Sequence, residues 1–187
     1  MQKVWIAAGL TLALVGSTPA VASAQTFLTP YAGSTFGGDT PANKFTTGVS
    51  LTFMGDVAGF EVDFGYSPDF FNQENEFVLI ADSNVTNLMA NLVIGPGAGP
   101  VRPYGVVGIG LLRSRAEATD LFDGLTVNDT AFNAGFGVIG MISSRVGLRG
   151  DVRYFRALQD PDDDDDVDVS VGNFDFWRAT GGVTFRF

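Results

Sequence analysis

The sequence contains no cysteine and no histidine among its 187 residues. The missing cysteines exclude disulfides, so burial and hydrogen bonding must stabilise the fold even in an oxidising compartment. The missing histidine removes the usual base of hydrolases and acyltransferases, and no Asp/Glu pair stands out as a substitute. The glycine-rich stretches lack the following helix that a phosphate-binding loop needs. We therefore predict no catalytic residue, no enzyme activity and no cofactor.

Basic residues are also scarce, with 11 Lys and Arg against 21 Asp and Glu, a net charge of −10 and a pI of about 4.2. A nucleic-acid partner is excluded, because phosphate binding needs a clustered basic surface. Beyond residue 24 the chain lacks an apolar run of the roughly 18 residues that a membrane-spanning helix needs. The exported chain is therefore either soluble or a membrane protein built from strands.

The first 24 residues have the layout of a bacterial signal peptide. Lys3 supplies the positive start, residues 4–15 form the apolar segment, and Ala22 and Ala24 supply the small residues of a cleavage site before Gln25. We expect export, with a leader over residues 1–24 and one domain over residues 25–187. An uncleaved N-terminal anchor is the alternative.

Strict alternation of apolar and polar residues, the period of a β-strand, recurs after the leader. The clearest case is residues 60–66, where one face carries Phe60, Val62, Phe64 and Tyr66 and the other carries Glu61, Asp63 and Gly65. The same period holds in residues 44–54, 132–138, 148–154 and 177–187. Residues 27–36, 85–94 and 102–113 are also expected to be extended, but their pattern leaves open which side chains share a face.

The connections between these strands alternate in length. Long polar connections are expected at residues 37–43, 69–83, 116–128 and 157–173, and tight ones at 55–56, 95–101 and 142–145. Outer-membrane barrels have this asymmetry, with short periplasmic turns and longer extracellular loops, and their strands are about ten residues long. We therefore predict an all-β fold: an eight-stranded antiparallel up-and-down transmembrane β-barrel, located in the bacterial outer membrane.

A soluble β-sandwich is the main rival, because its strands alternate as well. The polar face of a sandwich strand is wet and rich in Lys and Glu, whereas here the polar faces are mostly Gly, Ser, Thr and Asn, which suit a narrow, filled barrel interior. Aromatic residues also stand at the strand ends, with Tyr154 and Trp177 near one rim and Phe185 and Phe187 near the other. Such girdles are typical of membrane barrels.

Three segments resemble a known family. The last strand, with Val183, Phe185 and Phe187, resembles the C-terminal signal that the barrel assembly machinery recognises. Residues 102–110 (RPYGVVGIG) and 147–154 (GLRGDVRY) are similar to recurrent strands of the OmpA/OmpX-like outer-membrane β-barrel superfamily. The resemblance implies outer-membrane lipids and lipopolysaccharide as surroundings and the assembly machinery as a partner in biogenesis. It includes no peptidoglycan-binding domain, so we expect no tethering to the cell wall.

Seven charged residues fall on the polar faces of the expected strands: Glu61, Asp63, Arg149, Asp151, Arg153, Arg178 and Arg186. Facing lipid would cost about 2–4 kcal/mol per basic residue near the midplane. We therefore expect them to face the lumen and to pair there, because an unpaired buried ion is costly. The favoured interpretation is a salt-bridged plug. The alternative is a gate whose charges exchange partners and open a narrow pore.

Three further groups are candidates for binding outside the barrel. In the acidic run 160–168, the candidate ligands for loosely bound divalent cations are Asp162, Asp164, Asp166 and Asp168, although a solvated, self-repelling loop also explains the run. Arg113, Arg115 and Arg156 stand at the extracellular strand ends and suit lipopolysaccharide phosphates. Ordinary strand-end anchoring or lumen pairing explains them equally well. Apolar residues at 70–71 and 77–80 indicate either an interaction patch or strands that continue above the membrane.

Together these patterns favour a non-enzymatic integral outer-membrane barrel that supports envelope integrity or surface interaction through its extracellular loops. A low-conductance channel for ions or small solutes is the second hypothesis. A soluble periplasmic or secreted β-domain that binds a ligand is the third.

Overall fold

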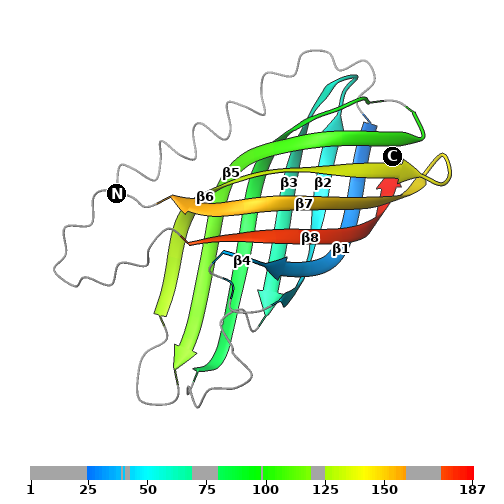
Figure 1. Cartoon of the computed structure of the whole chain (residues 1–187). Coiled ribbons are helices and arrows are strands. Elements are labelled where there is room, and N and C mark those ends of the chain that lie inside the picture. The colour runs from blue at the N-terminus through cyan, green and yellow to red at the C-terminus, as the bar shows by residue number, and fades with distance from the viewer. Residues whose placement is uncertain are drawn as a thin grey trace.

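The computed structural model describes residues 25–38, 40, 43–68, 80–97, 99–118, 125–158 and 174–187. Eight antiparallel strands follow one another around a closed barrel (Figure 1). They are β1 (Gln25–Phe36), β2 (Lys44–Met54), β3 (Ala58–Pro68), β4 (Ile80–Ile94), β5 (Val101–Ala118), β6 (Leu125–Met141), β7 (Val146–Leu158) and β8 (Asp175–Arg186). Within these ranges, no helix is long and apolar enough to cross a membrane. The expected leader and the acidic run 160–168 lie outside the described residues.

The barrel closes where β8 pairs with β1, from Phe27 opposite Arg186 to Phe36 opposite Trp177. The start of β1 and the end of β8 therefore lie at the same end of the barrel, which also holds the turns 55–57, 95–100 and 142–145. We call this the turn end, and the opposite end the loop end. The prediction of eight antiparallel strands in a barrel is confirmed, and the soluble sandwich is wrong because the first and last strands are hydrogen-bonded neighbours.

The alternation places charged and apolar side chains on opposite sides of the wall. On β3, Glu61 and Asp63 are fully buried, while Phe60, Val62 and Phe64 are exposed on the outer surface. The structure also settles the three strands whose facing the pattern left open. Their inward side chains include Phe27, Thr29, Tyr31 and Thr35 on β1, Val85, Asn87, Met89, Asn91 and Val93 on β4, and Arg102, Tyr104, Val106 and Leu112 on β5.

Strands β4, β5 and β6 are longer than the others, with 15, 18 and 17 residues. The pairing of β4 with β5 continues to Ile80 opposite Ala118, and that of β5 with β6 to Ala116 opposite Leu125. The three strands run past the rim at the loop end (Figure 1). The connections expected at residues 69–83 and 116–128 are therefore shorter than predicted. Outside the membrane a strand needs no alternation of apolar and polar residues, so alternation does not mark where such a strand ends.

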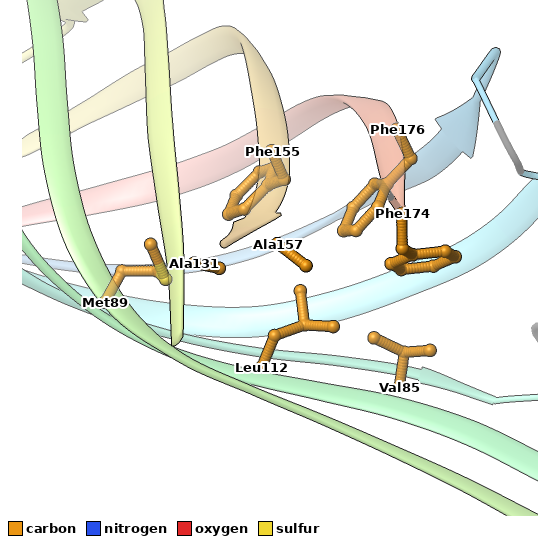
Figure 2. Packing of buried hydrophobic residues seen from close by; sticks show 8 residues of the cluster. All are labelled: Val85, Met89, Leu112, Ala131, Phe155, Ala157, Phe174 and Phe176. Carbon is orange, nitrogen blue, oxygen red and sulfur yellow. The ribbon is translucent and has the colours of Figure 1, made fainter. Parts of the chain in front are cut away.

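The lumen is packed in three layers. Eight buried apolar residues fill the loop end, and we call them the loop-end cluster (Figure 2): Val85, Met89, Leu112, Ala131, Phe155, Ala157, Phe174 and Phe176. Six others fill the turn end, the turn-end cluster: Phe27, Met54, Val93, Tyr104, Val106 and Ile139. Polar and charged side chains lie between the two clusters.

Candidate functional site

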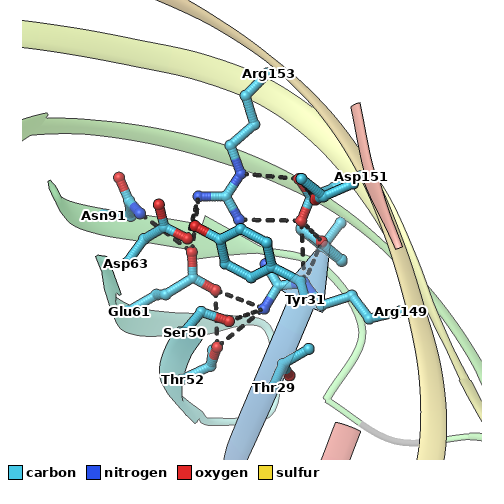
Figure 3. A network of polar contacts seen from close by, with 12 residues as sticks. Thr29, Tyr31, Ser50, Thr52, Glu61, Asp63, Asn91, Arg149, Asp151 and Arg153 are labelled. Atoms are coloured by element: carbon cyan, nitrogen blue, oxygen red, sulfur yellow. Dashed lines mark hydrogen bonds and ion pairs between the residues drawn. The ribbon is translucent and has the colours of Figure 1, made fainter. Parts of the chain in front are cut away.

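The middle layer of the lumen contains three carboxylates and three guanidinium groups, which we call the charged layer. Figure 3 labels all of them except Arg178. Glu61 and Asp63 stand two residues apart on β3, so the period of two directs both inward. Arg149, Asp151 and Arg153 do the same on β7, and Arg178 comes from β8. Because the period of each strand fixes the direction of its side chains, the six charges meet inside the barrel.

Glu61 is the centre of the charged layer. Arg149 Nη1 lies 2.7 Å from Glu61 Oε2, and Arg153 Nη1 lies 2.9 Å from Oε1. Two neutral groups also donate to this carboxylate: Thr52 Oγ1 to Oε2 at 2.8 Å and Asn91 Nδ2 to Oε1 at 3.1 Å. Each oxygen of the buried carboxylate therefore has one guanidinium and one neutral donor.

Asp63 and Arg178 form a second centre. Arg178 Nη2 donates to Asp63 Oδ1 at 2.8 Å, and Asn87 Nδ2 donates to the same oxygen at 3.1 Å. The guanidinium carbon of Arg178 also lies 5.0 Å from the ring centre of Tyr31 and 4.7 Å from that of Phe155. Contact with aromatic faces stabilises a desolvated cation. Because Phe155 belongs to the loop-end cluster, Arg178 joins the charged layer to that cluster.

Asp151 links the two remaining arginines. Arg153 donates from Nε and Nη2 to the two oxygens of Asp151 at 3.2 and 3.1 Å, and Arg149 Nε donates to Oδ2 at 3.2 Å. The Tyr104 hydroxyl donates to Asp151 Oδ2 at 2.9 Å and accepts from Arg149 Nε at 2.6 Å. Tyr104 belongs to the turn-end cluster, so this tyrosine joins the charged layer to the other end of the barrel.

Charge balance explains how six ions can be buried together. Each ion taken out of water costs several kcal/mol unless partners compensate it, and here three negative charges meet three positive ones. The space left beside the turn-end cluster is about 10 Å³, lined in part by Phe27, Thr52 and Arg149. This is close to the volume that one water molecule needs. The arrangement braces opposite walls of the barrel, and this space among the described residues is too small for a substrate.

One residue of the expected lumen set lies elsewhere. Arg186 is at the turn end, where its Nη1 is 3.5 Å from Gln25 Oε1, and it forms no ion pair with the six other charges. Its inclusion in the network is therefore corrected. Alternation gives the side of the wall that a residue faces, whereas its height along the barrel depends on its distance from the strand end.

The other candidate residues are spread over the barrel. Arg113 is exposed near the loop end of β5, opposite Asn128, and Arg156 is half-buried on β7, opposite Asp175. The backbone of Arg115 pairs with Thr126, and its side chain lies outside the described part, as do Ala22, Ala24, Asp162, Asp164, Asp166 and Asp168. Val183, Phe185 and Phe187 are exposed near the turn end. Among the described residues, no group of three carboxylates could hold a metal ion.

Sequence reasoning missed the neutral partners of the charged layer. Asn91 donates to Glu61 and accepts from Asn133 Nδ2 at 2.8 Å, and Asn87 donates to Asp63. The signal was present, because Asn87 and Asn91 are four residues apart and therefore share one face of a strand. An asparagine inside a membrane strand points to the lumen, since its amide would be unsatisfied in lipid.

Solved structures with the same fold come from several bacteria. Neisserial surface protein A matches with a TM-score of 0.64 at 14% identity, covering 88% of this chain and 97% of that one. The N-terminal β-barrel domain of Pseudomonas aeruginosa OprF matches with a TM-score of 0.57 at 16% identity, covering 88% of this chain and 100% of that one. A third match is Yersinia pestis Ail, the attachment invasion locus protein, in complex with the heparin analogue sucrose octasulfate. Its TM-score is 0.57 at 15% identity, and the match covers 88% of this chain and 99% of that one.

No curated protein matches the sequence. The family model described as "Outer membrane protein beta-barrel domain" matches residues 8–187, nearly the whole chain. The closed barrel, its apolar outer surface and its charged lumen agree with that match. The chain therefore belongs to the outer membrane protein β-barrel domain family and is an outer-membrane protein.

Proposed function

We propose that this protein is a closed, non-enzymatic barrel that supports the integrity of the outer membrane and carries its extracellular loops as an interaction surface. The observation that supports this proposal is the three-layered lumen, in which the charged layer lies between two apolar clusters. Opening a pore would require breaking the ion pairs of Glu61 and also moving both clusters. Each of those steps costs several kcal/mol.

The loop end supports the interaction role. The paired strands β4, β5 and β6 extend beyond the rim, and the chain between β7 and β8 carries the acidic run 160–168. The acidic run makes this end rich in carboxylates, and the whole chain has a net charge of −10, so this surface suits a cationic partner. A sulfated ligand such as the one bound by Yersinia pestis Ail is less compatible with this charge.

Three contacts expected from the sequence remain part of the proposal. Divalent cations would bind the carboxylates of the acidic run. Lipopolysaccharide phosphates would contact Arg113, Arg115 and Arg156 near the loop end. The barrel assembly machinery would recognise the last strand through Val183, Phe185 and Phe187, whose side chains are exposed along β8 and at its end.

A low-conductance channel is the second candidate, favoured by one detail of the charged layer. Arg153 Nη1 is 2.9 Å from Glu61 but also 3.9 Å from Asp63 Oδ2. Arg153 thus has a second carboxylate within reach, and exchange of partners would need only a small movement. This exchange alone leaves both apolar clusters in place, so we favour the closed barrel.

The test is a deletion strain in which entry of a hydrophobic fluorescent dye reports damage to the outer membrane. We expect faster dye entry without the protein and restoration by the wild-type chain. A second complementing chain has residues 159–173 replaced by a short Gly-Ser connection, and we expect it to restore the barrier but to lose the surface interaction. Unchanged dye entry in the deletion strain would contradict the role in envelope integrity.

A further inference from the structure

The turn end of the barrel carries an unbalanced positive charge. Arg102, Arg145 and Arg186 all lie there, whereas Asp56 is the one acidic residue of the three turns 55–57, 95–100 and 142–145. Within the described ranges, no carboxylate forms an ion pair with any of these arginines. This end therefore differs from the charged layer, where every guanidinium has a carboxylate partner.

Arg145 and Arg186 are held side by side. Arg186 N donates to Arg145 O at 2.8 Å, one step beyond the pair formed by Val146 and Phe185. Like charges on directly opposite residues of two strands are destabilising. Among the described residues, the side chain of Arg186 has one neutral acceptor at the limit of hydrogen bonding, Gln25 Oε1 at 3.5 Å. Within the described part of the chain, no side-chain carboxylate pairs with either guanidinium group.

A surface depression lies between these arginines and the lipid-facing side. Its volume is about 700 Å³, and its lining consists of Ser144, Arg145, Val146, Phe185, Arg186 and Phe187. Phe187 is 80% exposed and Phe185 39% exposed. Arginines beside exposed aromatic rings at a strand end match the boundary between lipid headgroups and acyl chains.

An apolar hollow of about 470 Å³ lies next to it on the outer face. Gly140 and Leu148, which are opposite each other on β6 and β7, both line it. A Cβ added at Gly140 would meet no atom within 4 Å, so no side chain of the described residues fills this space. Leu148 and Val146, two residues apart on the lipid-facing side of β7, border the hollow and the depression respectively.

We propose that this end of the barrel binds an anionic phospholipid of the periplasmic leaflet. The phosphate group contacts Arg145 and Arg186, and one acyl chain lies in the hollow at Gly140. Short turns mark the periplasmic side of outer-membrane barrels, which places the site at the phospholipid leaflet. Arginine is well suited to phosphate, because its guanidinium donates two parallel hydrogen bonds.

The test uses the full chain, expressed in a Gram-negative host and extracted from its outer membrane in detergent. Phosphatidylglycerol or phosphatidylcholine is added, and native mass spectrometry measures how much of each remains bound. We expect preferential retention of phosphatidylglycerol, reduced about fivefold by Arg145→Gln and again by Arg186→Gln. The control is Lys44→Gln, which removes a positive charge at the loop end, where β2 begins, and should leave the preference unchanged.

Two further arms separate the parts of the proposal. Gly140→Leu fills the hollow and should weaken retention of both lipids alike. Millimolar inorganic phosphate should not displace the bound lipid, since the acyl chain contributes to binding. Equal retention of the two lipids by the wild-type protein, an unchanged preference after Arg145→Gln, or displacement by phosphate would each overturn the site. A heat-dependent mobility shift in SDS gels confirms that every variant is folded.

Discussion

Arg153 of β7 and Glu61 of β3 form an ion pair of 2.9 Å in the middle of the lumen, with side chains that are 1% and 0% exposed. The strands that carry them are not neighbours in the barrel. The pair therefore connects distant parts of the wall through the interior, which backbone hydrogen bonds cannot do. This connection makes the charged layer both a brace and a barrier.

Replacing Glu61, the carboxylate that Arg149 and Arg153 share, should lower the free energy of unfolding. We predict that Glu61→Gln destabilises the barrel by about 3–5 kcal/mol, because Arg149 and Arg153 remain buried without their common partner. Urea unfolding in lipid vesicles, followed by tryptophan fluorescence, measures the change. The matched control is Asp56→Asn in an exposed turn, which should stay within about 0.5 kcal/mol of wild type. If Glu61→Gln loses no more stability than Asp56→Asn, the ion pairs contribute little to the free energy of unfolding.

The loop-end cluster gives a second prediction. Phe155 is fully buried and stacks on Phe176 with ring centres 5.0 Å apart. Phe155→Ala should cost about 3–5 kcal/mol, since it loses apolar contacts and leaves a cavity. Phe136 is 65% exposed on the outer face, so Phe136→Ala leaves no cavity and should cost less in the same unfolding experiment. Equal losses for the two variants would contradict a packed lumen.

Two glycines form a matched pair for testing how tightly the lumen is filled. A Cβ added at Gly65 would lie 2.7 Å from Arg178 Nη1 and 3.0 Å from Tyr31 Oη, whereas a Cβ at Gly181 would meet nothing within 4 Å. Gly65→Ala should therefore destabilise the barrel by about 1–3 kcal/mol through overpacking. Gly181→Ala should be close to neutral. The idea of a filled lumen fails if both variants unfold at the same urea concentration.

The tryptophans offer a test of both processing and membrane depth. The sequence has two, Trp5 in the expected leader and Trp177, so cleavage after Ala24 would leave Trp177 alone. Trp177 is 40% exposed on the outer face and contacts Tyr154, with ring centres 5.3 Å apart. We predict a mature mass that begins at Gln25, and stronger quenching by bromines near the lipid glycerol than by bromines at the acyl ends. Stronger quenching by bromines at the acyl ends would show that Trp177 lies in the membrane interior and not in an aromatic girdle at the interface.

Much of the fold could be predicted from alternation alone. In residues 60–66 and 148–154 one face is apolar and the other polar, because lipid and a charged lumen impose opposite requirements. The facing of residues 27–36, 85–94 and 102–113 could not be predicted, since the apolar clusters place Phe27, Met89 and Tyr104 inside while other apolar residues face lipid. Where both environments are apolar, the period of two carries no information about direction.

The charged layer was partly predictable for a related reason. A charge on a membrane strand must face inward, which identified Glu61, Asp63 and Arg153. Which carboxylate pairs with which arginine depends on strand register and on the height of each residue along the barrel, and alternation gives neither. Arg186 was therefore assigned to the charged layer although it lies at the turn end. Strands that continue above the membrane were one of two interpretations of the apolar residues 77–80, and β4 begins at Ile80. The extensions of β5 and β6 were not predicted, because pairing outside the membrane leaves no apolar pattern.

The most direct test of the closed barrel is single-channel recording of the refolded protein in a planar lipid bilayer. A heat-dependent shift in SDS gels first confirms that the sample is folded. The account predicts a silent bilayer, because the charged layer and both apolar clusters block the lumen. Steady, reproducible openings from fully folded protein would contradict it, and would identify exchange of Arg153 between Glu61 and Asp63 as a gate.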